Sequence, residues 1–168
     1  MIPPLLVDSN VWSHLILGTS AMQSRVRSQM TELKGKYPGA AMVTSAICVA
    51  ECLVAARRRA DSAQGEQAEA AFRAVFESGD VEVVPVTNQV LNRAATLRAD
   101  RLKLAASRGS QIAKADGGKL LLPDAIIAAS CLESDPPAIL VTQNVADFYY
   151  LEEGISKTVA NLMVEMIG

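Results

Sequence analysis

The chain has 168 residues, of which half are hydrophobic and a fifth are charged, and its 16 Lys and Arg against 18 Asp and Glu give a formal net charge of -2. A chain of this length buries roughly 70% of its unfolded surface in one core, so we expect a single domain over residues 1–168. The near balance of charge excludes a polybasic protein that binds nucleic acid by bulk electrostatics. Aromatic residues make up only 4% of the chain, which argues against a base-stacking platform.

No apolar run approaches the roughly 20 residues that a membrane-spanning helix needs, and Asp8 interrupts the apolar start that a signal peptide requires. We therefore expect a cytoplasmic protein with no membrane partner. The three cysteines, Cys48, Cys52 and Cys131, are odd in number and lie in apolar segments, which indicates reduced core residues. Cys48 and Cys52 share a helix face, but with His14 as the only histidine, buried thiols are favoured over a zinc site.

Four short apolar runs predict buried strands, and the segments between them have the periodicity of helices. The strands are expected at residues 4–7, 41–44, 81–86 and 139–142. The helices are expected at residues 20–36, 45–59, 63–77, 88–106 and 124–132. Strands that alternate with helices predict an α/β fold with a central, mostly parallel sheet flanked by helices.

Two further segments have weaker patterns. Residues 105–119 mix Gly, Ser and charged residues without periodicity, which predicts a mobile insertion within the domain. The tail from Gly154 predicts a short strand around residues 156–159, followed by a terminal helix.

Four acidic residues stand out because apolar segments surround them or end at them. Asp8 ends the first predicted strand, Asp147 follows the last one, and Asp124 opens the most apolar helix. Turn or N-cap roles account for each of these aspartates taken alone. Glu51 has no such role, because it is the only charged residue within residues 46–56, and burying it unpaired is costly.

The predicted topology brings these acids together. The carboxyl ends of parallel strands lie along one edge of a sheet, where ligands bind. Asp8 and the loop before Asp147 follow strands at that edge, and Glu51 and Asp124 lie in helices that the same edge can reach. Converging carboxylates repel one another unless a cation compensates them, and an all-oxygen set suits Mg²⁺, with Mn²⁺ as a substitute.

The chain resembles the PIN-domain ribonucleases, most closely the VapC-type toxins of bacterial toxin-antitoxin pairs. The segments that carry the resemblance are LLVDSNV at 5–11, VTSAICVAEC at 43–52, KLLLPDAIIAAS at 119–130 and LVTQNVADF at 140–148. The resemblance implies a PIN-like three-layer fold. It also implies a catalytic and metal-binding set consisting of Asp8, Glu51, Asp124 and Asp147. It further implies three accompanying polar residues that contact either the metal-binding acids or the substrate, namely Asn10, Thr142 and Asn144.

The function that the resemblance implies is a Mg²⁺-dependent endoribonuclease that acts as a toxin. Its implied partners are RNA, a cognate VapB-type antitoxin and a second copy of the chain in a homodimer. The residues leave two alternatives open: a noncatalytic PIN-like binding module, and a metal-dependent nuclease or phosphatase outside a toxin-antitoxin pair. A phosphatase of the receiver type needs an acidic pair beside the first strand, and LLVDSN has a single acid.

Other charged residues have alternative roles. Asp100 is a possible fifth acid, although Lys103 at i+3 indicates a solvated ion pair. Arg57, Arg58 and Arg59 end the predicted helix of Glu51. They either complement the helix C-terminus in solvent or hold RNA phosphates.

Overall fold

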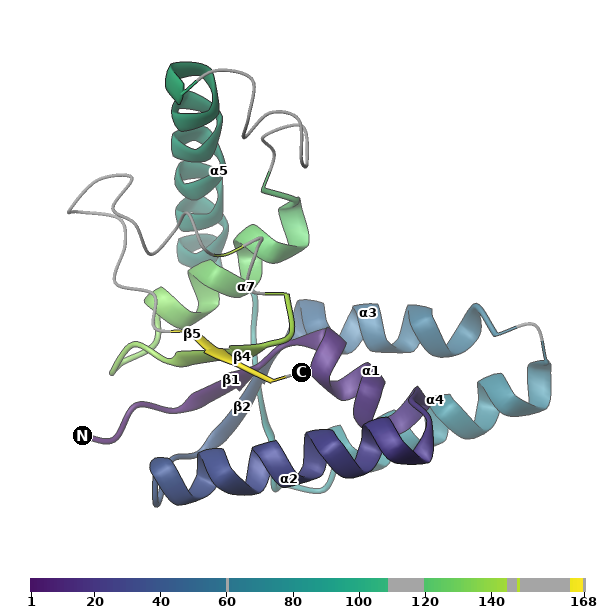
Figure 1. The fold of residues 1–168 in the computed structure, drawn as a ribbon. Helices are drawn as coiled ribbons and strands as arrows, with labels where there is room; N and C mark the ends of the chain where they lie inside the picture. The colour runs from purple at the N-terminus through teal and green to yellow at the C-terminus, as the bar shows by residue number, and fades with distance from the viewer. Residues whose placement is uncertain (60, 109–119, 145–147, 149–163, 168) are drawn as a thin grey trace.

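The computed structural model describes residues 1–59, 61–108, 120–144, 148 and 164–167, with residues 104–108 as helical backbone alone. Its strands are β1 (Leu5–Val7), β2 (Met42–Ser45), β3 (Glu82–Val84), β4 (Ile139–Thr142) and β5 (Val164–Met166). Its helices are α1 (Ser9–Leu17), α2 (Ser20–Lys36), α3 (Ala46–Arg57), α4 (Ser62–Phe76), α5 (Asn88–Arg108) and α7 (Leu122–Leu132). The sheet lies between α5 and α7 on one side and α1, α2 and α4 on the other (Figure 1).

The sheet is parallel at each described strand pair, in the order β3-β2-β1-β4-β5. β1 is central, because Leu5 pairs with Met42 on one side and with Ile139 on the other. The chain adds β2 and β3 on one side of β1 and then returns to the other side with β4, so the strand order reverses between β1 and β4. Open α/β sheets bind ligands in the crevice at such a reversal. The predicted α/β fold with a parallel sheet is therefore confirmed.

Alternating side chains of β1 fill two separate cores. Leu6 packs in the core that contains α5 and α7, whereas Leu5 and Val7 pack in the core that contains α1, α2 and α4. α3 contributes to both, with Cys48 in the first core and Cys52 in the second. Because both faces of the sheet are covered at its centre, every residue of β1 and β4 is buried, whereas β3 and β5 at the edges contain exposed or charged residues.

The four predicted strands and five predicted helices are present, with their ends displaced by at most two residues. Helix α1 is not among the predicted helices, because Asp8, Ser9 and Asn10 at its start are typical of a turn. The prediction of a helix at the end of the tail is wrong, because Val164–Met166 forms β5 and pairs with β4. Three residues carry too little periodicity to reveal a strand. The strand expected at residues 156–159 and most of the predicted insertion lie outside the described residues.

Two smaller expectations concern the cysteines and membranes. Cys48, Cys52 and Cys131 are free and buried, as predicted. In the part of the chain that the structure describes, no helix has both the length and the apolar character needed to cross a membrane.

A buried chain of hydrogen bonds ties α1 to the sheet. Trp12 Nε1 donates to Thr44 Oγ1 at 3.2 Å, and Thr44 Oγ1 donates to the carbonyl oxygen of Val7 at 2.9 Å. Thr44 is fully buried, and Trp12 is 3% exposed. One hydroxyl thus satisfies a buried donor from α1 and a buried acceptor from β1, which helps to set the direction in which α1 leaves the sheet.

Replacing Thr44 with Val should lower the free energy of unfolding by at least about 2 kcal/mol, because the Trp12 indole and the Val7 carbonyl would both lose their partner. Thr44→Ser keeps the hydroxyl and removes one methyl group, so it should cost about 1 kcal/mol. Urea denaturation followed by the fluorescence of Trp12, the only tryptophan, measures both losses. Equal losses would assign the effect to packing instead of hydrogen bonding.

Candidate functional site

Asp8 directly follows β1, at the edge where the strand order reverses. The residue is 3% exposed, and both carboxylate oxygens accept hydrogen bonds. Oδ1 accepts from the backbone N–H of Ser9 at 2.6 Å. Oδ2 accepts from Asn10 Nδ2 at 2.8 Å and from Thr142 Oγ1 at 2.7 Å. Asp8 is also the N-cap of α1, where the sequence by itself offered an Asx turn as its local role, and this capping coexists with its place in the candidate site.

Thr142 and Asn10 connect the end of β4 to this carboxylate. Besides donating to Asp8, Thr142 Oγ1 accepts from Asn10 Nδ2 at 3.1 Å and from the backbone N–H of Asn144 at 3.0 Å. Asn10 Oδ1 accepts from the backbone N–H of Gln143 at 3.2 Å. The structure thus gathers the three predicted polar residues around Asp8 and the loop that follows β4.

Glu51 reaches Asp8 through Ser9. It lies in the second turn of α3, and its Oε2 accepts from Ser9 Oγ at 2.7 Å. The same hydroxyl oxygen is 3.3 Å from Asp8 Oδ1. A hydroxyl has one proton, so the shorter distance assigns that proton to Glu51. Ser9 is not among the predicted site residues, and its position directly after Asp8 is the one sequence signal for its role.

The pKa values of both acids are raised by their surroundings. For Asp8, burial raises the pKa, and the hydrogen bonds from Thr142, Ser9 and Asn10 oppose this effect. For Glu51, burial is again the main cause, the hydrogen bond from Ser9 opposes it, and the charge of Asp8 raises the pKa further. Both carboxylates are therefore less stable as anions than they are in water. A nearby cation would relieve both the burial cost and the repulsion.

Thiols lie beside this acidic pair. Burial, followed by the charge of Asp8, raises the pKa of Cys48 far above its ordinary value. The pKa of Cys131 is raised as well, first by burial. The buried thiols are therefore neutral in the metal-free protein, and the carboxylate oxygens of Asp8 and Glu51 are the donors that suit a hard divalent cation.

The other predicted acids differ in position. Asp124 lies partly buried in the first turn of α7, whose N-cap is Leu121, so the N-cap alternative for Asp124 is wrong. Residues 145–147, including Asp147, lie outside the described part. Among the described residues, hydrogen bonds join Asp8 to Glu51 through Ser9, and no group of three Asp, Glu, His or Cys side chains is close enough to hold one ion. The place of Asp124 and Asp147 in the ligand set stays a prediction. Asp100 pairs with Lys103 at 3.6 Å on α5.

Comparisons with known proteins place this geometry in a family. A family model described as PIN domain matches residues 5–148. Two solved structures are similar over nearly the whole chain. VapBC2 from Rickettsia felis, bound to a promoter DNA fragment, has 18% identity, covers 98% of each chain and has a TM-score of 0.62. VapBC-1 from nontypeable Haemophilus influenzae has 21% identity, covers 96% of each chain and has a TM-score of 0.62.

A third structure is similar over a smaller share of the chain. VapC20 from Mycobacterium tuberculosis, a toxin that cleaves the sarcin-ricin loop, has 18% identity and a TM-score of 0.53. The similarity covers 77% of this chain and 82% of that one. At such identities these likenesses establish a shared fold. A search of curated proteins finds no match.

Replacing Glu51 with Gln should make the metal-free protein melt higher at pH 7, by about 1–2 °C, because solvent screens this half-buried charge and limits the relieved cost to about 0.5 kcal/mol. A carboxyl group whose folded pKa is raised favours folding while it is protonated and costs stability once it is charged. The difference between Glu51→Gln and wild type should therefore shrink as pH falls toward 4.5, the ordinary value for Glu.

Thermal melts in EDTA at several pH values measure this difference. Glu66→Gln, at an exposed position of α4, is the matched control and should leave the melting temperature unchanged. A gap for Glu51→Gln that is absent, or that stays constant with pH, would show that Glu51 is not destabilised by burial beside Asp8.

Proposed function

This chain belongs to the PIN-domain family, and from that premise we propose that it is a metal-dependent endoribonuclease, the toxin of a toxin-antitoxin pair. The observation that carries the proposal is the buried carboxylate of Asp8, joined to Glu51 through Ser9 at the reversal of strand order. The similarity to VapBC complexes and to a toxin that cleaves the sarcin-ricin loop supports it.

Mg²⁺ is the cofactor that we propose, with Mn²⁺ as a substitute. Asp8, Glu51, Asp124 and Asp147 would hold it. Carboxylate oxygens are the ligands that these hard ions prefer, and the raised pKa values of Asp8 and Glu51 fit a site that is stabilised by a cation. When bound, such an ion neutralises charge that develops on a phosphodiester and lowers the pKa of water.

The polar residues of the site position the acids. Asn10 and Thr142 hold Asp8 Oδ2, and Thr142 also holds the backbone of Asn144. Ser9 turns Glu51 toward Asp8, where Glu51 either completes the ligand set or orients the attacking water. No side chain needs to become covalently attached to RNA. Direct attack of water on phosphorus, with the bond to the 3′-oxygen broken and a proton passed to that oxygen, would leave a 5′-phosphate and a 3′-hydroxyl.

The proposed partners are a cognate VapB-type antitoxin and a second copy of the chain, and the proposed location is the cytoplasm, where the RNA substrate is found. An inhibitory peptide that carries an Arg could place its guanidinium on the Asp8 and Glu51 carboxylates as a charge-assisted pair. The guanidinium would then occupy the place of the metal ion beside these carboxylates and inhibit the enzyme.

The replacements Asp8→Asn and Asp124→Asn should each reduce Mg²⁺-dependent RNA cleavage by more than the roughly 10- to 100-fold that loss of an outer-shell partner costs, because each removes charge from the proposed ligand set. The assay is cleavage of total cellular RNA in Mg²⁺, in Mn²⁺ and in EDTA. Asp100→Asn is the control and should cleave as wild type does, since Asp100 pairs with Lys103 on α5.

Melting curves in EDTA check that each variant is folded, which matters for Asp8 because its carboxylate accepts several hydrogen bonds. Full activity in EDTA would contradict the metal mechanism. A protein that binds Mn²⁺ but cuts no RNA would favour the noncatalytic binding module.

Expression of the chain alone should arrest growth, and co-expression with the adjacent reading frame should restore it and co-purify a small protein. The physical reason is that the acidic pair and its surroundings can be covered by a charge-complementary peptide. Growth curves and affinity purification measure the two effects. If the chain is harmless alone and no neighbour binds, the toxin role is refuted while the nuclease activity can stand.

A further inference from the structure

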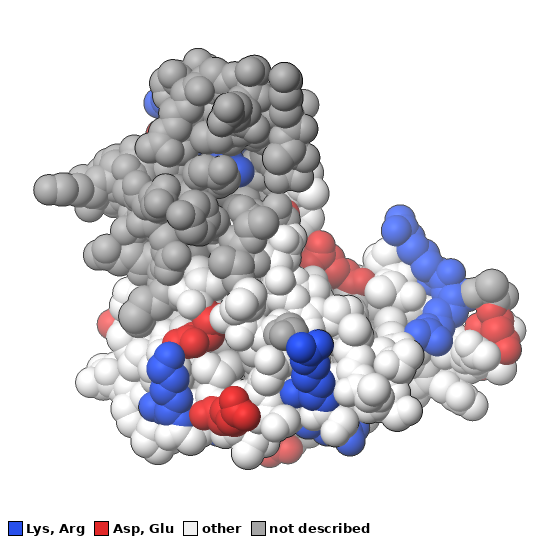
Figure 2. All heavy atoms as spheres, in the orientation of Figure 1, with Lys and Arg blue, Asp and Glu red and all other residues white. Residues whose placement is uncertain are grey.

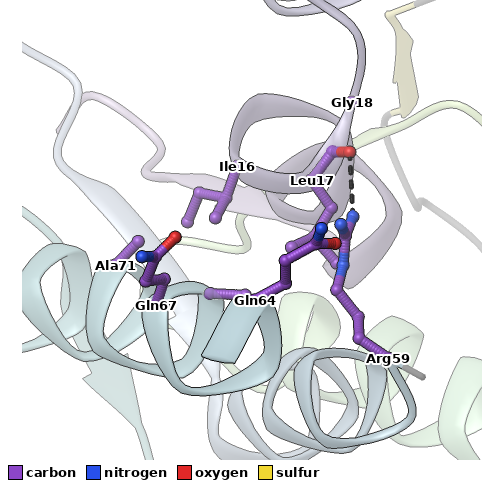
Figure 3. Close-up of a pocket in the computed structure, with 8 residues that line it drawn as sticks. Ile16, Leu17, Gly18, Arg59, Gln64, Gln67 and Ala71 are labelled. Carbon is purple, nitrogen blue, oxygen red and sulfur yellow. Dashed lines mark hydrogen bonds between the residues drawn. The ribbon is translucent and has the colours of Figure 1, made fainter. Parts of the chain in front are cut away.

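The three consecutive arginines at the end of α3 differ in what their side chains bind. Arg57 forms a bidentate pair with Glu69 of α4, in which Nε–Oε2 and Nη2–Oε1 are both 2.8 Å. Arg59 Nη2 donates to the carbonyl oxygen of Leu17, at the end of α1, at 3.1 Å (Figure 3). The side chain of Arg58 is exposed and has no partner among the residues that the structure describes.

Arg58 and Glu51 line the same groove along the outer face of α3. Its volume is about 410 Å³, and its other lining residues are Ile47, Ala50, Val54 and Ala55. The groove therefore has an apolar floor with one acidic and one basic residue. Figure 2 shows the same distribution over α3, with acidic atoms beside its first half, basic atoms at its end and uncharged surface between them.

The spacing of the two charged residues suits a nucleic acid strand. Seven residues of helix separate Glu51 from Arg58, which corresponds to a rise of about 10.5 Å. An RNA strand whose reacting phosphate lies beside Asp8 and Glu51 would pass along the apolar floor of the groove on α3. A second phosphate of the same strand would then lie at Arg58. A guanidinium binds phosphate through two parallel hydrogen bonds, and the other two arginines already have partners.

We propose that Arg58 binds a backbone phosphate of the RNA substrate and that the groove along α3 guides the strand into the site. This inference rests on the proposed ribonuclease function. The chain has a net charge of -2, so its attraction for RNA must come from local contacts such as this one. Arg58 is a substrate-binding residue, remote from the reacting atoms.

The test compares Arg58→Gln with Arg57→Gln, a matched change of a neighbouring arginine whose charge is already paired with Glu69. Steady-state cleavage of a single-stranded oligoribonucleotide in Mg²⁺ gives KM and kcat at several salt concentrations. Arg58→Gln should raise KM about tenfold and leave kcat within about twofold, because a charge-assisted contact to substrate is lost while the acids remain. Arg57→Gln should change neither constant beyond about twofold.

Salt dependence provides an independent readout. Each phosphate contact to a single strand contributes about 0.7 to the slope of log affinity against log salt, so Arg58→Gln should flatten the slope of log(1/KM) by about 0.7. Arg57→Gln should keep the wild-type slope. If Arg58 had only a structural role, Arg58→Gln would lower the melting temperature and leave this slope unchanged.

The remaining outcomes separate this inference from the proposed function. If wild type cleaves RNA and the two arginine variants have equal KM values and slopes, Arg58 does not bind substrate, and the ribonuclease function stands. Sedimentation velocity of the same proteins tests whether a second copy covers the groove. If Arg58→Gln changes the sedimentation coefficient but has the same KM as wild type, a second copy covers the groove, which also overturns the inference. If wild type cleaves no RNA, the proposed function and this inference fail together.

Discussion

The buried carboxylate of Asp8 is the constraint on which the site depends. It caps α1, it accepts from Thr142 at the end of β4, and through Ser9 it is linked to Glu51 of α3. Its backbone N–H donates to the carbonyl oxygen of Val141 at 3.0 Å, which continues the ladder between β1 and β4. Elements that are distant in sequence thus meet at one carboxylate, and its hydrogen bonds add to the strand pairing and core packing that set their relative positions.

The carboxylates that suit the site for a cation also lower the stability of the metal-free protein. Burial raises the pKa of Asp8 and of Glu51, so the metal-free protein holds two anions in surroundings that disfavour them. The burial of apolar side chains in the cores on both faces of the sheet offsets the unfavourable free energy of burying these carboxylates. Hydrogen bonds to Asp8 keep the cost moderate, since they favour its charged form. A site of this kind has its donors oriented before any cation or substrate arrives.

Ion pairs at the surface have a different role, because they join the outer elements to one another. Glu165 Oε1 accepts from Lys36 Nζ at 2.5 Å and from Tyr37 Oη at 2.6 Å, which connects the end of α2 to β5 at the edge of the sheet. Arg57 and Glu69 connect α3 to α4 in the same way. Exposed pairs contribute little to stability. The pairing of Arg57 with Glu69 matters here because, with Arg59 bound to the Leu17 carbonyl, only the side chain of Arg58 among the three arginines has no partner within the described residues.

Local sequence pattern determined the parallel α/β architecture, the limits of most helices and strands, and the choice of Asp8 and Glu51, because buried strands and isolated charges are visible without distant contacts. Four features required the tertiary structure. α1 begins with residues typical of a turn, and β5 forms only by pairing with β4. The bridge from Asp8 through Ser9 to Glu51, and the contacts of Arg57 with Glu69 and of Arg59 with Leu17, join residues of different elements. Such hydrogen bonds depend on the positions of whole elements, and local periodicity carries no information about them.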